Sequence, residues 1–176
     1  FDRKCTGHLQ EVMRESVEVA ISRLFHEGGA LEGKSHKKFL HVHFTDGSVP
    51  KDGPSAGLMV YAAIYSAFKK VLVKPYFAAT GEIDLKRFVA APVGGITAKL
   101  LAAKRAGIRE VAIPLANRKD IKKLPNGVGI ITPSDLAGRS WREISLEDKP
   151  EGSFTVYCVE KPEDVLELAF PNDYSP

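Results

Sequence analysis

Strand-length and helix-length apolar segments alternate along this chain of 176 residues. Apolar residues recur at helical spacing in four segments that are predicted to be helices: residues 7–26, 55–69, 96–105 and 163–170. Shorter apolar runs predict strands at residues 38–44, 76–80, 88–91, 110–113, 128–132 and 154–159, and a short helix is predicted to begin at Asn117. The alternation predicts one domain of α/β or α+β class, with mixed, partly parallel sheets packed against helices and a parallel portion around residues 76–132.

The sequence Pro-Lys-Asp-Gly-Pro-Ser-Ala-Gly occupies residues 50–57, at the start of the second predicted helix. Pro54 fixes the φ angle of a first helical turn, and Gly53 allows the backbone to approach another group closely. A serine at such a position is surrounded by unpaired N–H donors and by the positive end of the helix dipole, which stabilise developing negative charge. We therefore predict that Ser55 is a nucleophile; an ordinary capping serine is the alternative.

A serine nucleophile needs a base that removes its proton, and the sequence points to a lysine. All five histidines precede Ser55, and the chain has no G-x-S-x-G sequence. Lys99 follows a Gly-Gly pair and lies between Ile96 and Leu100, so its stem can lie on the buried face of a helix. Burial would lower the pKa of its amine from the ordinary value of about 10.4 and leave it neutral enough to act as a base. The alternative is a solvated helix lysine.

Three motifs together resemble the proteolytic domain of the Lon family, the ATP-dependent serine proteases with a Ser–Lys dyad. They are the sequence around Ser55, Thr-Gly-Glu-Ile at residues 80–83 and Pro-Val-Gly-Gly-Ile-x-x-Lys at residues 92–99. The likeness extends to four outer segments, at residues 6–16, 40–44, 111–114 and 117–120. It covers residues 5–132 and resumes over residues 154–170.

The resemblance implies a dyad in which Ser55 attacks a peptide carbonyl while Lys99 takes up the proton and returns it to the leaving amine. Backbone N–H groups of residues 53–55 are the implied donors to the oxyanion. Thr80 is implied to hold the lysine amine near Ser55, and a plain strand-end threonine is the alternative. Asp52 is predicted to cap the helix, to pair with Lys99 in an inactive form, or to do both.

Three departures from the family pattern carry predictions of their own. Residues 84–91 lack the glycine of the family and are one residue longer, which predicts a bulge or a looser turn in a hairpin. Residues 133–153 are interpreted as an insertion loop between two strands. Residues 1–176 as a whole are interpreted as one Lon-type proteolytic domain, from which the further strands that open the family domain are expected to be missing.

Composition argues against several other classes of protein. Cys5 and Cys158 predict free thiols in a reducing setting, and a bridge between them is the alternative. No run of 18 apolar residues predicts a membrane span, and a net charge of +3 with scattered lysine pairs does not support a nucleic-acid partner. His41 and His43 have the spacing of metal ligands, but they lack an acidic or cysteine partner at a matching spacing, so a structural role is preferred and no metal is predicted.

No cofactor is predicted for this chain, because it lacks the G-x-x-x-x-G-K-[ST] sequence of a P-loop. The resemblance implies that ATP and Mg²⁺ bind an ATPase region outside the chain and that the full protein is a homo-oligomeric, hexameric ring. The implied function is that of a serine endopeptidase acting on unfolded or damaged proteins and peptides. A non-catalytic Lon-like scaffold domain is the alternative. The expected location is intracellular: the bacterial cytoplasm, the mitochondrial matrix or the peroxisome.

Overall fold

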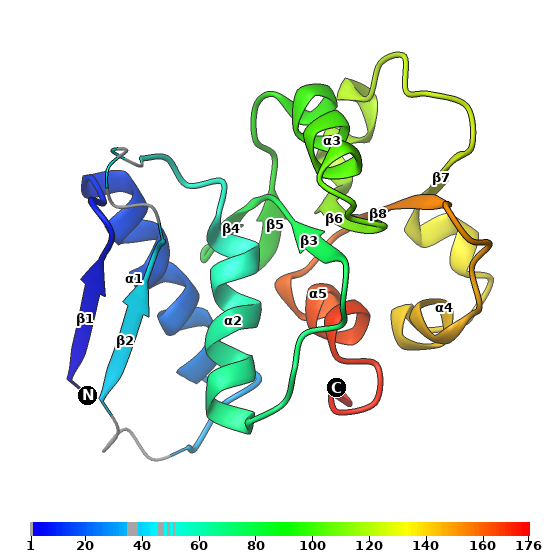
Figure 1. Ribbon diagram of the computed structural model, residues 1–176. Coiled ribbons are helices and arrows are strands. Elements are labelled where there is room, and N and C mark those ends of the chain that lie inside the picture. The colour runs from blue at the N-terminus through cyan, green and yellow to red at the C-terminus, as the bar shows by residue number, and fades with distance from the viewer. Residues whose placement is uncertain (1, 35–38, 46–47, 49, 51) are drawn as a thin grey trace.

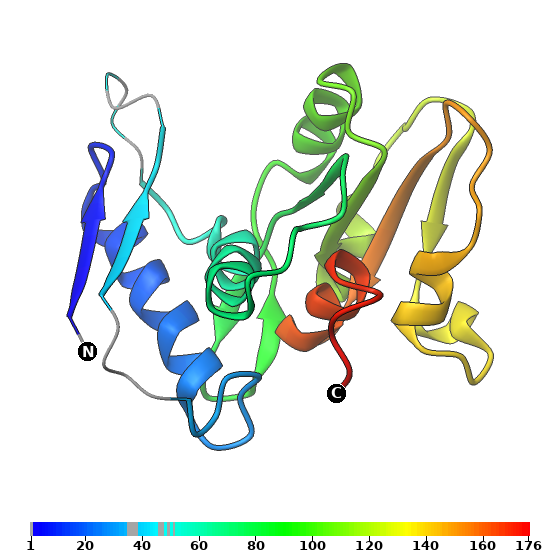
Figure 2. The same cartoon turned by 60° about the horizontal axis from the view of Figure 1, so that its bottom comes forward.

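A computed structural model describes residues 2–34, 39–45, 48, 50 and 52–176 of the chain. The helix α2 (Gly57–Lys69) lies at its centre, with a two-stranded sheet on one side and a four-stranded sheet on the other (Figure 1, Figure 2). Neighbouring elements cover this helix on more than one side, and Leu58, Tyr61 and Ala62 are fully buried. This position explains why the sequence of α2 is apolar nearly all round instead of along one stripe.

The two-stranded sheet pairs β1 (Arg3–Thr6) with β2 (Leu40–His43) in parallel, and Thr6 lies opposite His43. The helix α1 (Glu11–Phe25) connects the two strands. It begins at Glu11, later than the predicted residue 7, because Gly7 and His8 have φ angles of 112° and 58° that a helix cannot include. The sequence did not predict β1, and residue 38 of the strand predicted over residues 38–44 lies outside the described residues.

The larger sheet has four parallel strands in the order β3-β6-β8-β7. These strands are β3 (Phe77–Ala79), β6 (Glu110–Pro114), β8 (Phe154–Val159) and β7 (Val128–Ile131). Helix α3 (Ile96–Arg105) covers one face, while α2 and α5 (Pro162–Ala169) cover the other (Figure 2). Alternate residues of β8 serve the two cores, with Val156 under α3 and Tyr157 under α5. The predicted α/β class is confirmed.

An antiparallel hairpin links β3 to α3. Its strands are β4 (Glu82–Asp84) and β5 (Val89–Ala91), which pair continuously from Glu82 opposite Ala91 to Asp84 opposite Val89. The two strands therefore pair without a bulge, and residues 85–88 form the turn. The Asp84 carboxylate orders this turn by accepting hydrogen bonds from the backbone N–H groups of Lys86 and Arg87 at 2.9 and 3.0 Å.

Residues 133–153, predicted as an insertion loop, contain regular structure. They include the 3₁₀ helix η2 (Pro133–Leu136) and the helix α4 (Trp141–Leu146). Ser140 and Glu143 begin α4 with a reciprocal capping box, and Trp141 and Ile144 are buried in the core. The segment is thus a packed part of the domain. Its origin as an insertion stays a prediction.

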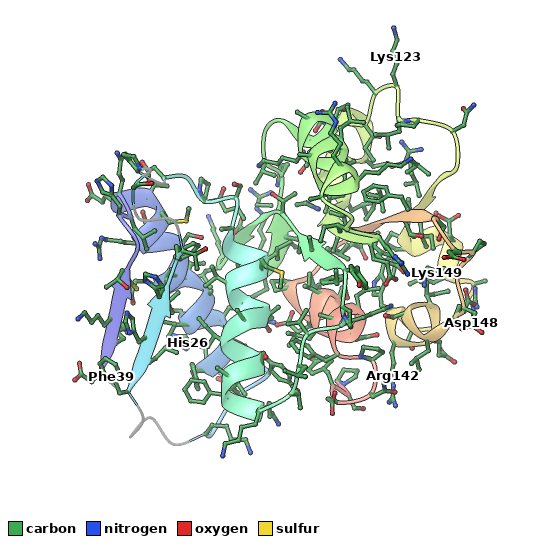
Figure 3. The ribbon with its side chains drawn as sticks, in the orientation of Figure 1. His26, Phe39, Lys123, Arg142, Asp148 and Lys149 are labelled. Carbon is green, nitrogen blue, oxygen red and sulfur yellow. The ribbon has the colours of Figure 1, made fainter. Side chains whose placement is uncertain are left out.

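A buried carboxylate fastens this segment to the sheet. Glu110 on β6 is 6% exposed, and it accepts hydrogen bonds from Lys74 and from the hydroxyl of Tyr157. Lys149, which follows α4 and is labelled in Figure 3, lies 3.2 Å from the same carboxylate. Lys74 also donates to the backbone oxygen and the hydroxyl of Ser145 on α4. Two lysine charges compensate the buried carboxylate, which would otherwise be costly.

Three further predictions can be compared with the structure. Cys5 and Cys158 are free, as predicted. None of the described helices is long and apolar enough to cross a lipid bilayer. The short helix predicted to begin at Asn117 is the 3₁₀ helix η1 (Leu115–Asp120), which starts two residues earlier. The side chain of Asn117 contacts another segment instead of capping its own helix.

Candidate active site

The loop that leads to α2 is held against α1. The carboxylate of Asp52 accepts a hydrogen bond of 3.0 Å from the backbone N–H of Met13, in the first turn of α1. The hydroxyl of Ser16 on α1 donates to the carbonyl of Pro54 at 3.3 Å. Gly53 has a φ of 103°, in the region that favours glycine. We did not predict this role of Ser16 from the sequence. A hydroxyl on the apolar face of a predicted helix is the feature that indicates it.

Asp52 therefore caps a different helix from the one predicted. We expected it to stabilise α2, the helix that follows it, but its carboxylate faces the unpaired N–H groups at the start of α1. No ion pair joins Asp52 to Lys99, although both residues are described. The predicted inactive pairing of these two side chains is thus not present in this structure.

Ser55 lies in a turn directly before α2, which begins at Gly57. The turn is closed by a hydrogen bond of 3.1 Å from the N–H of Gly57 to the carbonyl of Pro54. The carbonyl of Ser55 accepts hydrogen bonds from the N–H of Gly81 at 2.9 Å and from the hydroxyl of Thr80 at 3.2 Å. These bonds fix the backbone of the serine against the end of β3.

Gly81 has a steric reason to be glycine. Its φ is 156°, and a Cβ atom there would lie 2.5 Å from Leu58 Cδ1 and 2.9 Å from Pro114 Cγ. The N–H of Leu58 donates to the carbonyl of Gly81 at 3.1 Å, and the N–H of Gly81 donates to the carbonyl of Ser55. Two backbone hydrogen bonds therefore join the start of α2 to the segment after β3. The N–H of Thr80 in turn donates to Ala112 on β6 at 3.0 Å. Thr80 and Ser55 are thereby tied to the central sheet.

Lys99 reaches this cluster from α3. Its amine donates a hydrogen bond of 3.4 Å to the hydroxyl of Thr80, a residue that is 9% exposed. Burial lowers the pKa of the Lys99 amine, and no charged neighbour contributes to the shift. A lysine in this state supplies a neutral amine at lower pH than a solvated one does.

Thr80 thus lies between the two residues predicted to form the dyad. Its hydroxyl accepts from Lys99 and donates to the Ser55 carbonyl. The side chains of Ser55 and Lys99, both described, do not hydrogen-bond to each other directly. The N–H groups of Gly53 and Ser55 donate to no other described residue, which leaves them free for a ligand atom, whereas Pro54 has no N–H.

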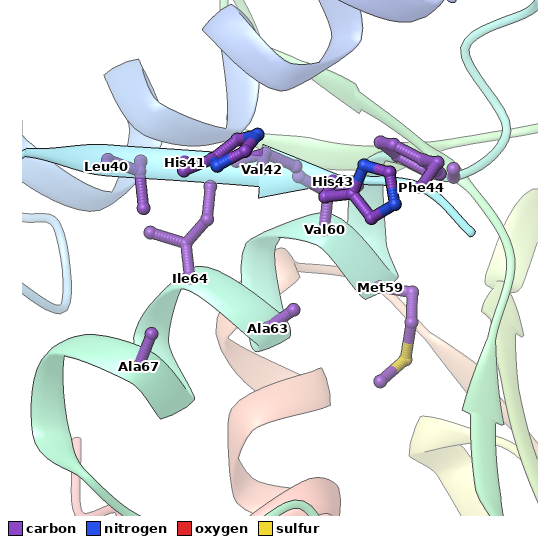
Figure 4. A pocket seen from close by; sticks show the side chains of 11 residues that line it. Leu40, His41, Val42, His43, Phe44, Met59, Val60, Ala63, Ile64 and Ala67 are labelled. Carbon is purple, nitrogen blue, oxygen red and sulfur yellow. The ribbon is translucent and has the colours of Figure 1, made fainter. Parts of the chain in front are cut away.

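An apolar groove of about 430 Å³ lies between β2 and α2 (Figure 4). Its lining comprises Leu40, His41, Val42, His43, Phe44, Ala56, Met59, Val60, Ala63, Ile64 and Ala67. Ala56, the residue that follows Ser55, brings the groove next to the predicted nucleophile. Apart from the rings of His41 and His43, the lining side chains are apolar, as expected of a site that receives an apolar group.

The histidines of β2 have hydrogen-bonding partners within the small sheet. The hydroxyl of Thr6 lies 2.8 Å from His41 Nε2 and 2.8 Å from His43 Nδ1. The hydroxyl can donate to only one ring, so the other ring donates to it, which couples the two tautomers. Among the described residues no three side chains of His, Cys, Asp or Glu are grouped as metal ligands.

Comparisons with known proteins point to a single family. Residues 2–131 match the family model described as "Lon protease (S16) C-terminal proteolytic domain". Lon protease 1 of Myxococcus xanthus is 42% identical over 152 residues, which cover 83% of this chain and 18% of that protein. The Lon protease of Cytophaga hutchinsonii is 42% identical over 148 residues, covering 82% of this chain and 17% of that protein. The Lon protease of Treponema pallidum is 34% identical over 172 residues, or 96% of this chain and 17% of that protein.

Proposed function

This chain belongs to the family of Lon protease C-terminal proteolytic domains, a family of serine peptidases, and on that premise we propose that Ser55 and Lys99 form its catalytic dyad. The observation that carries the proposal is the position of Thr80, whose hydroxyl contacts both the Lys99 amine and the Ser55 backbone. The lowered pKa of Lys99 supports the role of a base.

In the proposed reaction the hydroxyl of Ser55 attacks the peptide carbonyl while neutral Lys99 accepts its proton. Lys99 then protonates the leaving amine, and a water molecule hydrolyses the acyl-enzyme with Lys99 again as base. Thr80 holds the amine, and the free N–H groups of Gly53 and Ser55 stabilise the oxyanion. Catalytic hydrogen bonds are often long in an empty site, so we propose that the Ser55–Lys99 bond forms when substrate binds.

We further propose that the groove between β2 and α2 receives an apolar side chain of the substrate. Its wall ends at Ala56, so a side chain bound there places the next peptide bond close to Ser55. Burial of one medium-sized apolar side chain contributes about 1.5–3 kcal/mol, enough to orient an extended peptide.

The chain spans less than a fifth of the length of these relatives, at 18% and 17% of the first two. We therefore propose only by resemblance that the whole protein is a hexameric ring that degrades unfolded or damaged proteins, with ATP and Mg²⁺ bound outside this chain. For its location we propose the bacterial cytoplasm, with the mitochondrial matrix and the peroxisome as alternatives. A nucleic-acid partner is not proposed.

A fluorophosphonate probe tests the dyad, because it labels only a serine whose hydroxyl is activated. We expect mass spectrometry to find the label on Ser55, and we expect Lys99→Ala to abolish it. Lys104→Ala, on the same helix, is the matched control and should be labelled like the unchanged protein. Absence of labelling on Ser55 in the assembled protein would contradict the dyad and favour the scaffold alternative.

A further inference from the structure

The side chain of Asn117 on η1 is one of the most buried polar groups of the molecule, at 1% exposure. Its Oδ1 accepts a hydrogen bond of 2.9 Å from the N–H of Val93, and its Nδ2 donates to the carbonyl of Val93 at 2.8 Å. Nδ2 also donates to the carboxylate of Asp120 at 2.8 Å. The side-chain amide of Asn117 thus pairs with both the backbone N–H and the carbonyl of Val93, as the backbone of a neighbouring β-strand would.

Val93 directly precedes the turn that begins α3. In this turn Gly95 has a φ of 70°, and its carbonyl accepts the hydrogen bond of 3.0 Å from the N–H of Lys99. The position of Lys99 therefore depends on where the Gly94–Gly95 turn lies. A Cβ atom on either glycine would meet nothing within 4 Å, so the two glycines contribute no side-chain packing, whereas Ile96 and Leu100 after them are buried in the core.

Hydrogen bonds from residues 117–122 add to this packing and hold the turn on both sides. Asn117 fixes the residue before the turn, and a second contact fixes the first turn of α3 beyond it. The hydroxyl of Thr97 donates to the carbonyl of Asp120 and accepts from the N–H of Lys122, each at 3.2 Å. Both ends of the turn are thus tied to the segment that continues β6.

The same strand also positions Thr80. Ala112 on β6 accepts the hydrogen bond from the N–H of Thr80, and β6 runs directly into η1, which carries Asn117. One continuous segment, residues 112–120, therefore sets the position of Thr80 at one end and of the Lys99 helix at the other. The contact of 3.4 Å between Lys99 and Thr80 joins the two parts that this segment holds.

We propose that Asn117 is a positioning residue, whose amide holds the Gly94–Gly95 turn and so places the amine of Lys99 against Thr80. This inference rests on the proposed dyad. The position needs an acceptor and two donors in one plane, which only an amide supplies among side chains of this size. An aspartate would lose both donors and would face the carboxylate of Asp120.

The test compares Asn117→Asp and Asn117→Leu with the unchanged protein in peptide hydrolysis. Displacement of a reacting group by about 1 Å costs up to about 100-fold in rate, so we expect kcat to fall about 10- to 100-fold with KM little changed. The rising limb of the kcat–pH profile should move to higher pH, because a displaced amine regains solvent. The exchange Asn117→Asp with Asp120→Asn restores a hydrogen bond between the two positions and should recover part of kcat.

Ser145→Ala is the matched control for lost stability, since it removes a buried polar side chain on α4, remote from this turn. It should lower the unfolding temperature while leaving kcat and the pH profile unchanged. Asn117 variants that fold and keep the kcat and pH profile of the unchanged protein would overturn the positioning role. If Ser55→Ala or Lys99→Ala retained activity, the dyad itself would be wrong, a result distinct from failure of the Asn117 test.

Discussion

The hydroxyl of Thr80 accepts a hydrogen bond from the Lys99 amine at 3.4 Å and donates its own proton to the carbonyl of Ser55 at 3.2 Å. This pair of bonds fixes the direction of the threonine hydroxyl, because its single proton is directed to the serine backbone. Its lone pairs then face the lysine and hold the amine against Thr80. A neutral amine held in this way keeps its own lone pair free to accept a proton.

Replacement of Thr80 by valine tests this arrangement, since valine keeps the shape and removes the hydroxyl. We expect kcat for peptide hydrolysis to fall about tenfold, less than the roughly 100-fold or more that a proton-transfer group itself contributes, because Thr80 only holds the base in place. Thr155→Val, at another buried threonine on β8, is the control. Equal activity of the two variants would show that the hydroxyl of Thr80 has no part in catalysis.

The lowered pKa of Lys99 predicts how activity depends on pH. Burial disfavours the charged amine, so the neutral base forms below the ordinary lysine pKa of about 10.4. Activity should therefore rise with pH, with a midpoint below that value, because each increase in pH enlarges the neutral fraction. The measurement is kcat against pH with a fluorogenic peptide. A flat profile between about pH 6 and pH 9 would argue against lysine as the base.

Substitution of Gly81 by alanine should disrupt the site and the fold together. The new Cβ would lie 2.5 Å from Leu58 Cδ1 at a φ of 156°, so overpacking adds to backbone strain. We expect a loss of about 2–4 kcal/mol in the free energy of unfolding, measured by urea denaturation, with loss of activity.

Gly152→Ala separates the two causes, since Gly152 also has a positive φ, 75°, but a Cβ there would meet nothing within 4 Å. This control should cost only the backbone strain, on the order of 1 kcal/mol, and leave activity unchanged. A loss at Gly81 no greater than at Gly152 would exclude a contribution from packing against Leu58.

The sequence predicted those parts of the site that depend on local motifs. Ser55 precedes a helix, Lys99 lies one turn into another, and Thr80 directly follows a strand; each of these positions follows from short-range pattern. The partners of Asp52 and Asn117 could not be predicted in this way. Asp52 bonds Met13, 39 positions away, and Asn117 bonds Val93, 24 positions away, so both contacts depend on tertiary packing.

The same limit applies to the fold. The main helices and the strands of the larger sheet were recognised from periodicity, because their buried faces dictate it. The strand β1 was missed because its sequence, Arg-Lys-Cys-Thr, shows no apolar alternation and is exposed or only partly buried. The helix α4 was missed because six residues, fewer than two turns, are too short for a period to appear, although Ser140 and Glu143 carry its capping signal.

The network around Glu110 should make stability depend on acid pH. Burial by itself would raise the pKa of this carboxyl, but hydrogen bonds from Lys74 and Tyr157 and the charges of Lys74 and Lys149 outweigh it, and the pKa is lowered. A carboxyl with a lowered pKa stabilises the fold above its unfolded-state pKa of about 4.3, and this stabilisation is lost as pH falls through the folded-state value.

We therefore expect Glu110→Gln to be less stable than the unchanged protein at pH 7 by about 1–3 kcal/mol, because two lysines lose their buried partner. The difference should shrink as pH falls below about 4.3, where the carboxyl of the unchanged protein also becomes neutral. Urea denaturation at a series of pH values measures it. Glu151→Gln, at an exposed position, is the control and should change stability little. A difference that stays constant down to pH values below that range would mean that Glu110 acts through packing and not through its charge.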